Sequence, residues 1–194
     1  MLLERQPMDP DATLIERTLE GDLTAFEALV ERHRAVVYRV AARIVGPHDA
    51  DDVSQDTFLR AFHRLGQYRG TASFRTWLLQ ITQNTALNAL DWARRRPSAP
   101  ADDAPEAPDP DPQRQPVSEL ERQERRERLE LKLDALRPEY RSLVVLRDLE
   151  GLSYDEIAGV LEMPLGSVKG RLHRARGELI ELLRNNTYDW ELPA

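Results

Sequence analysis

Apolar residues recur at helical spacing through most of this chain, glycine is scarce, and runs of β-branched residues are nearly absent. In the first half this pattern predicts helices over 11–20, 24–45, 50–65 and from 74 onward. We expect Thr24 and Glu27 to form a capping box and Asp49 to cap the third helix. The third helix is expected to pack through the apolar residues Val53, Phe58, Leu59 and Phe62.

The second half predicts helices over 119–136 and from Pro138 to near Gly151. Ser153 and Glu156 have capping-box spacing and begin a short helix, and a turn follows over 162–166. We expect Ser167 to cap the last helix. A short helix, a tight turn and a longer helix are typical of the helix-turn-helix motif.

Proline and acidic residues separate the two halves. Residues 97–118 contain seven of the thirteen prolines and five acids, a composition that favours an extended linker. The sequence therefore predicts an all-α protein of two small helical domains. Their expected bounds are 11–96 and 119–184, with a flexible Pro/Asp-rich linker at 97–118 and a tail at 185–194.

Composition excludes several function classes. The chain has no cysteine, so disulfides and thiolate zinc sites are absent. No apolar stretch approaches the roughly 20 residues that span a bilayer, and the N-terminus lacks secretory-signal features. We find no metal-ligand spacing, phosphate-binding glycine loop or Ser-His arrangement. We therefore expect a cytoplasmic protein that is not an enzyme, with no cofactor, no metal, no small-molecule substrate and no membrane insertion.

The last helix is basic in a chain whose net charge is −7. Its apolar residues point to one side and leave a cationic side outward. A cationic face is often merely solvated, but on the second helix of this motif it favours DNA contact. Ser167 and the helix N-terminus could bind a phosphate. The expected outward or flanking residues are Lys169, Gly170, Arg171, His173, Arg174 and Arg176.

Acidic residues cluster in the third helix, where four carboxylates lie within residues 49–56. A calcium loop would need a glycine and a distant glutamate, which are missing. Helix N-termini favour acids, which accounts for some of the four. Gln55 lies on the same face as Asp52 and Asp56. The acids that the helix N-terminus does not account for, together with Gln55, indicate docking onto a basic partner.

Aromatic and cationic residues mix at the start of the fourth helix. Tyr68, Arg69, Phe74 and Arg75 are suited to stacking unpaired bases and to binding the phosphate backbone, whereas we expect Trp77 to be a core residue. Four polar or basic residues continue along the same helix: Asn84, Asn88, Arg94 and Arg95.

Three strings resemble the extracytoplasmic-function (ECF) group of bacterial RNA polymerase sigma factors. They are DADDVSQDTFLRAF, FRTWLLQITQNTALNALDWARRR and LSYDEIAGVLEMPLGSVKGRLHRAR. The resemblance implies a promoter-specificity subunit whose partners are promoter DNA, the polymerase core (its β′ clamp helices and β flap) and an anti-sigma factor.

The resemblance also implies site residues. Asp52, Gln55 and Asp56 would dock on the clamp helices. The loop from Gln67 to Phe74, with Asn84, would capture a flipped base of the −10 element. The recognition helix would bind the −35 element, with Arg147 on the DNA backbone. The chain departs from the family at Thr82-Gln83 and at Asn88, which puts the recognised base in doubt.

Two alternatives remain. A stand-alone helix-turn-helix regulator would bind duplex DNA tightly without polymerase, but would need a dimer interface or a ligand pocket. An enzyme acting on nucleic acid lacks the catalytic residues described above.

Overall fold

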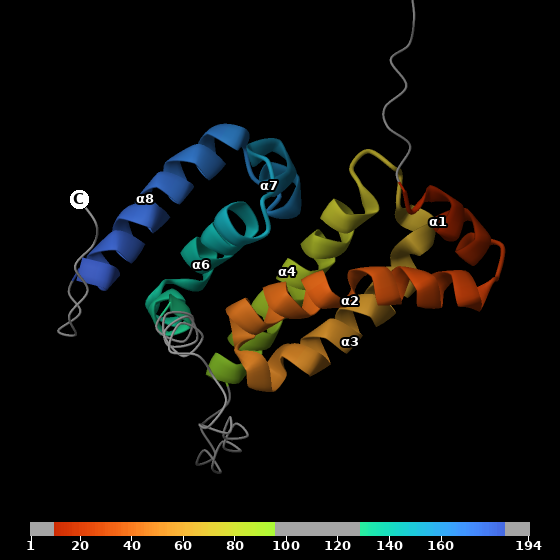
Figure 1. Ribbon diagram of the computed structural model, residues 1–194, viewed down its shortest axis with the longest axis horizontal. Helices are drawn as coiled ribbons and strands as arrows, with labels where there is room; N and C mark the ends of the chain where they lie inside the picture. Colours follow the sequence, from red (N-terminus) through yellow and green to blue (C-terminus); the bar gives the residue numbers. More distant parts are fainter. Residues whose placement is uncertain (1–9, 96–128, 185–194) are drawn as a thin grey trace, which may run out of the picture.

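The computed structural model describes residues 10–95 and 129–184, which we call the N-terminal and C-terminal modules. The N-terminal module is a bundle of helices (Figure 1). The predicted linker, the first part of the 119–136 helix and the tail lie outside the described residues. The elements of the N-terminal module are α1 (Ala12–Leu19), α2 (Leu23–Val45), α3 (Pro47–Arg64), the short 3-10 helix η1 (Leu65–Gln67) and α4 (Phe74–Arg95).

Two predicted helix starts in this module were wrong. Asp22, not Thr24, caps α2: its backbone is extended, and its carboxylate accepts hydrogen bonds from the backbone N–H groups of Thr24 and Ala25. Hydrogen bonds from the Thr24 hydroxyl and from Arg17, with a smaller contribution from the backbone N–H of Ala25, lower the pKa of Asp22 to about 2. Helix α3 begins at Pro47, because the fixed φ of proline suits the first helical position.

The C-terminal module contains the predicted helix-turn-helix. The Ser153–Glu156 capping box is confirmed, whereas Ser167 does not cap the last helix. That helix begins two residues earlier, and Pro164 O accepts the backbone N–H groups of Ser167 and Val168. The elements are a helical segment at 129–135, α6 (Pro138–Val144), the π-helical turn η2 (Val145–Leu149), α7 (Tyr154–Val160) and α8 (Leu165–Arg184).

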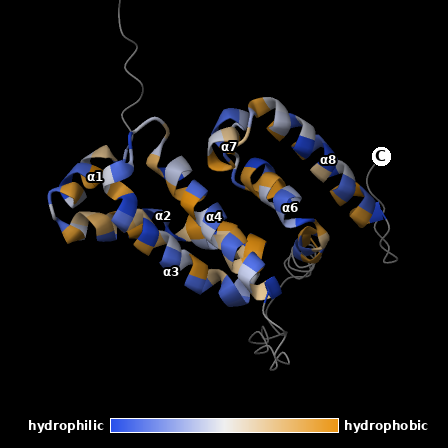
Figure 2. Ribbon diagram, turned by 180° about the vertical axis from the view of Figure 1, so that it is seen from behind, coloured by the Kyte–Doolittle hydropathy of each residue, from blue (hydrophilic) through white to orange (hydrophobic). Residues whose placement is uncertain are grey.

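The two modules pack against each other rather than standing apart. One cluster of buried apolar side chains includes Ile44 and Leu79 from the N-terminal module and Leu143, Leu146 and Ile157 from the C-terminal module. Helix α6 accordingly lies beside α4 in both views (Figures 1 and 2). The sequence predicted two tethered units. In the structure α2 instead contacts α6 and η2, and α4 contacts α7.

Buried polar contacts also join the modules. Gln83 donates to the Ser142 hydroxyl at 2.6 Å. The guanidinium of Arg141 donates to the carbonyl of Ile44 at 3.0 Å, and burial lowers the pKa of this arginine. Leaving these donors unpaired in the interface would cost free energy, so the two contacts favour this fit of the modules, although Gln83 Oε1 and Arg141 Nε are buried without a hydrogen-bond partner among the described residues.

Candidate nucleic-acid and protein interfaces

Helix α8 presents a cationic face. Val168, Leu172 and Ala175 are buried against the rest of the C-terminal module, which turns the intervening residues outward. The structure therefore places five predicted DNA-contacting residues on the exposed side of one helix: Lys169, Gly170, Arg171, His173 and Arg174.

Gly170 has no packing role within the described chain. A Cβ atom built at this position would meet no other atom within 4 Å. Glycine inside a helix costs about 1 kcal/mol relative to alanine, and no neighbour in the fold explains this cost. The open space above Gly170 therefore lies on the outer side of α8, where a partner could approach its backbone.

Two arginines predicted to contact DNA are engaged inside the module. Arg147 donates to the carbonyl of Leu152 at 2.7 Å, and its guanidinium lies 4.7 Å from the centre of the Tyr154 ring. Arg176 forms an ion pair with Asp148. The half-buried side chain of Arg147 thus also supports the turn that leads into α7, and its contact with the DNA backbone stays a prediction.

The loop before α4 is built on an aromatic cluster. Phe74 is 0% exposed, so the prediction that it contacts a base was wrong. Its ring instead supports those of Tyr68 and Trp77, at centroid distances of 5.9 and 5.6 Å. The Tyr68 hydroxyl donates to the carbonyl of Ala72 at 2.6 Å, which closes the loop. Trp77 is half-buried, so it is only partly the core residue that we expected.

A pocket of about 250 Å³ lies beside this loop. Loop residues Gln67, Tyr68 and Arg69 line it together with Trp77 and with Gly159 of α7. Aromatic side chains beside polar groups suit the stacking of an unpaired base. Because α7 contributes to the wall, the C-terminal module partly covers the pocket in this arrangement.

The polar residues farther along α4 divide between two places. Asn84 is exposed and follows Trp77 by seven residues, so it shares the helix face of Trp77. Asn88 is exposed too, but it lines a groove between α3 and α4. Arg94 and Arg95 are exposed in the last turn of α4, where they suit the helix dipole as well as a phosphate.

That groove contains the predicted polymerase-docking residues and has a volume of about 560 Å³. Asp52, Gln55 and Asp56 line it from α3. Leu59 and Trp92 also line it and are 59% and 56% exposed. The prediction that Leu59 packs in the core was therefore wrong. Carboxylates beside exposed apolar groups fit a partner that is both basic and apolar.

Side-chain contacts between the modules were not predicted from the sequence. Arg39 and Arg75 both bind the carboxylate of Glu150, at 3.0 and 3.3 Å. Gln80 donates to Glu162 at 2.7 Å, and the Thr76 hydroxyl donates to Glu156 at 3.3 Å. No local pattern marks these pairs, because their members lie 75 or more residues apart.

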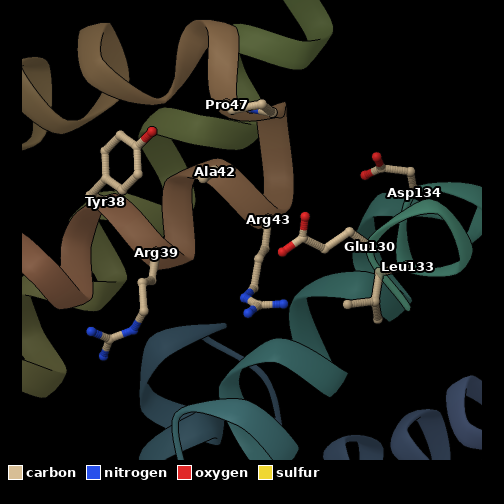
Figure 3. Close-up of a pocket in the computed structure, with 8 residues that line it drawn as sticks. All are labelled: Tyr38, Arg39, Ala42, Arg43, Pro47, Glu130, Leu133 and Asp134. Carbon is tan, nitrogen blue, oxygen red and sulfur yellow. The ribbon is translucent and has the colours of Figure 1, made fainter. Parts of the chain in front are cut away.

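A second pocket between the modules has mixed charge (Figure 3). It measures about 250 Å³. Arg43 of α2 and Glu130 of the 129–135 segment extend toward each other across it, and Tyr38 lines its far side. Within residues 10–95 and 129–184 we find no group of side chains suited to a metal ion and no helix long and apolar enough to cross a membrane.

Comparisons with known proteins cover both modules. Residues 29–96 match the Sigma-70 region 2 family, and residues 126–179 match Sigma-70, region 4. The ECF RNA polymerase sigma-E factor of Escherichia coli K12 is 36% identical over 176 residues, which cover 86% of this chain and 90% of that relative. The ECF RNA polymerase sigma factor SigE of Mycolicibacterium smegmatis is 39% identical over 171 residues, covering 87% of this chain and 65% of that relative.

A solved structure matches as well. CnrH, in complex with the cytosolic domain of CnrY, aligns with a TM-score of 0.66 and 30% identity. The alignment covers 91% of this chain and 99% of CnrH.

Proposed function

This chain belongs to the ECF group of RNA polymerase sigma factors, and we propose that its three exposed surfaces divide the work of promoter recognition between them. Sigma factors are transcription initiation factors and not enzymes. We place the action of this one in the cytoplasm, and we assign residues 11–96 and 119–184 to its two functional domains.

The groove between α3 and α4, which we call the acidic groove, is the proposed polymerase contact. Asp52, Gln55 and Asp56 would meet basic residues of the β′ clamp helices, and Leu59 and Trp92 would supply the apolar contact beside them. Asp56 is paired with Arg60 at 3.0 Å. Both side chains are about half exposed, and an exposed pair of this kind is worth at most about 1 kcal/mol. A basic partner can therefore replace Arg60 at little cost.

The loop over residues 67–73 before α4, which we call the aromatic loop, is the proposed contact for the opened −10 element. A flipped base would enter the pocket beside Tyr68 and Trp77, with Asn84 on the same face of α4. Phe74 would act indirectly by supporting both rings. Stacking contributes roughly 1–3 kcal/mol per base, comparable to the few kcal/mol that unpairing and unstacking a base costs.

Helix α8 is the proposed contact for the −35 element. The observation that carries the whole proposal is its exposed cationic face above a fully buried apolar face. The proposed contacts are Lys169, Arg171, His173 and Arg174. The backbone at Gly170 would lie close to the groove, and the C-terminal module would also dock on the β flap.

Reconstitution with core polymerase tests this function. The full chain and purified core should together initiate at a subset of genomic promoters that share sequence elements near −10 and −35, while neither component does so alone. A correctly folded chain that directs initiation at no promoter would contradict the proposal. Tight, sequence-specific binding of the free chain to duplex DNA would instead favour a stand-alone regulator.

An anti-sigma factor is part of the proposal. CnrH is solved in complex with the cytosolic domain of CnrY. In this chain the two modules pack against each other, an arrangement that we call closed, and an inhibitor would act by stabilising it. We expect an inhibitor to co-purify with the tagged chain from uninduced native cells and to block reconstituted initiation. If no co-purifying protein reduces initiation, this part of the proposal fails.

A further inference from the structure

Glu150 is an acid held between two arginines of the other module. Its carboxylate side chain is 5% exposed. Arg39 donates to it through Nε and Nη2 at 3.1 and 3.0 Å, and Arg75 donates through Nη2 at 3.3 Å. Arg75 also donates to the backbone carbonyl of Glu150 at 3.2 Å. The two guanidinium groups therefore converge on one anion.

Converging arginines need an anion between them. Two cations this close repel each other unless a negative group bridges them. The hydrogen bond to Glu150 raises the pKa of Arg39, because the carboxylate stabilises the charged form of the guanidinium. A planar guanidinium binds carboxylate and phosphate with the same paired geometry. Once Glu150 withdraws, the site is suited to a phosphate.

The position of the pair indicates which phosphate. Arg75 is the second residue of α4, directly after the aromatic loop. Thr76 and Gln80 from the same helix line the loop pocket, and each binds a carboxylate of the C-terminal module. Three acids of that module, Glu150, Glu156 and Glu162, thus face polar groups around the loop.

We propose that Arg39 and Arg75 form a phosphate-binding site for the separated promoter strand beside the aromatic loop, and that Glu150 occupies this site while the modules are closed. This inference rests on the proposed function, since it names further residues for the same DNA surface. Strand binding and module closure then compete for one pair of arginines.

The test uses the full chain and a fluorescent single-stranded oligonucleotide, with affinity measured by anisotropy over a range of salt concentrations. Glu150→Gln keeps the shape of the side chain but removes the bridging charge. We expect it to bind the oligonucleotide about tenfold more tightly, the lower end of what charge-assisted hydrogen bonds contribute. The matched control Glu139→Gln removes the same charge from an exposed position of the same module and should change affinity far less.

Arginine substitutions complete the test. Adding Arg39→Gln and Arg75→Gln to the Glu150→Gln chain should abolish the gain and reduce the salt slope by about 0.7, the value for one lost phosphate contact on a single strand. If Glu150→Gln and Glu139→Gln bind alike, or if the gain survives loss of both arginines, the proposal is overturned. No polymerase is present, so a failure here is distinct from a failure to initiate transcription.

A second measurement covers the case in which Glu150→Gln does not fold, as judged by circular dichroism. Holoenzyme carrying Arg39→Gln and Arg75→Gln is then compared with the unsubstituted holoenzyme on a promoter whose −10 region is already unpaired. The salt slope of binding should again fall by about 0.7. An unchanged slope would overturn the proposal.

Discussion

Replacing Asp52 and Asp56 with arginine should reduce the affinity of the chain for core polymerase by at least about 100-fold, because loss of one partner from a buried charged pair at an interface costs 2–5 kcal/mol. Reversing the charge adds repulsion from the basic partner. Both acids line the groove between α3 and α4, and neither is in the hydrophobic core. We therefore expect normal folding alongside the loss, measured by competition for labelled core.

Asp51 provides the matched control for this result. It is exposed on the same helix but does not line the groove, so Asp51→Arg should leave core affinity nearly unchanged. If Asp51→Arg and Asp52→Arg weakened binding equally, a general effect of charge would explain the data and the groove would lose its assignment.

Replacing Arg171 and Arg174 with glutamate should lower initiation by about 100-fold or more at promoters that need the −35 element. A good bidentate contact to a base edge contributes roughly 1–3 kcal/mol, and two such contacts would be lost. Both side chains are exposed on α8 and away from the buried face of the helix, so the module should still fold. Run-off transcription from one promoter, with and without its −35 sequence, measures the effect.

The expected pattern separates DNA recognition from polymerase binding. The Arg171→Glu, Arg174→Glu chain should bind core normally and lose its preference for templates that carry the −35 sequence. Arg184→Glu changes one charge at the other end of α8 and serves as control. Equal losses on templates with and without the −35 element would contradict the assignment of α8.

Local features were the most predictable part of this structure. The Ser153–Glu156 capping box follows from residues three positions apart, and the buried side of α8 follows from its periodicity. The cap of α2 was assigned wrongly because aspartate and threonine are both good caps. Which of the two takes the extended backbone is decided by the turn after α1, and the sequence pattern does not determine it.

Burial of individual large residues was harder to predict. The sequence pattern predicted that Leu59 packs in the core and that Phe74 contacts a base. In the structure Leu59 is exposed in the acidic groove and Phe74 is fully buried. Helical periodicity defines a face only to within one residue, and neighbouring helices determine which edge of that face is covered. The exposed Leu59 is informative, since it lies where a protein partner is proposed.

Closure of the two modules had no signal in the sequence. Gln83 and Ser142 are 59 residues apart, and Arg39 and Glu150 are 111 residues apart. Each looks like an ordinary polar residue of its own helix or turn. The composition of residues 97–118 predicts two units joined by a linker, but it carries no information on where the units would meet.

The distance between the modules tests the central claim most directly. Elements centred near −10 and −35 are about 25 base pairs apart, or about 85 Å along B-DNA, so modules that bind both must leave the closed arrangement. The chain has no cysteine, so spin labels can be attached to cysteines placed at the exposed positions Glu27 of α2 and Glu181 of α8. Electron spin resonance should give the closed distance in the free chain. On a promoter in the holoenzyme, the distance should be clearly longer, because modules bound to elements about 85 Å apart cannot stay in contact with each other. A distance that stays at its closed value in a holoenzyme that initiates transcription would contradict the account.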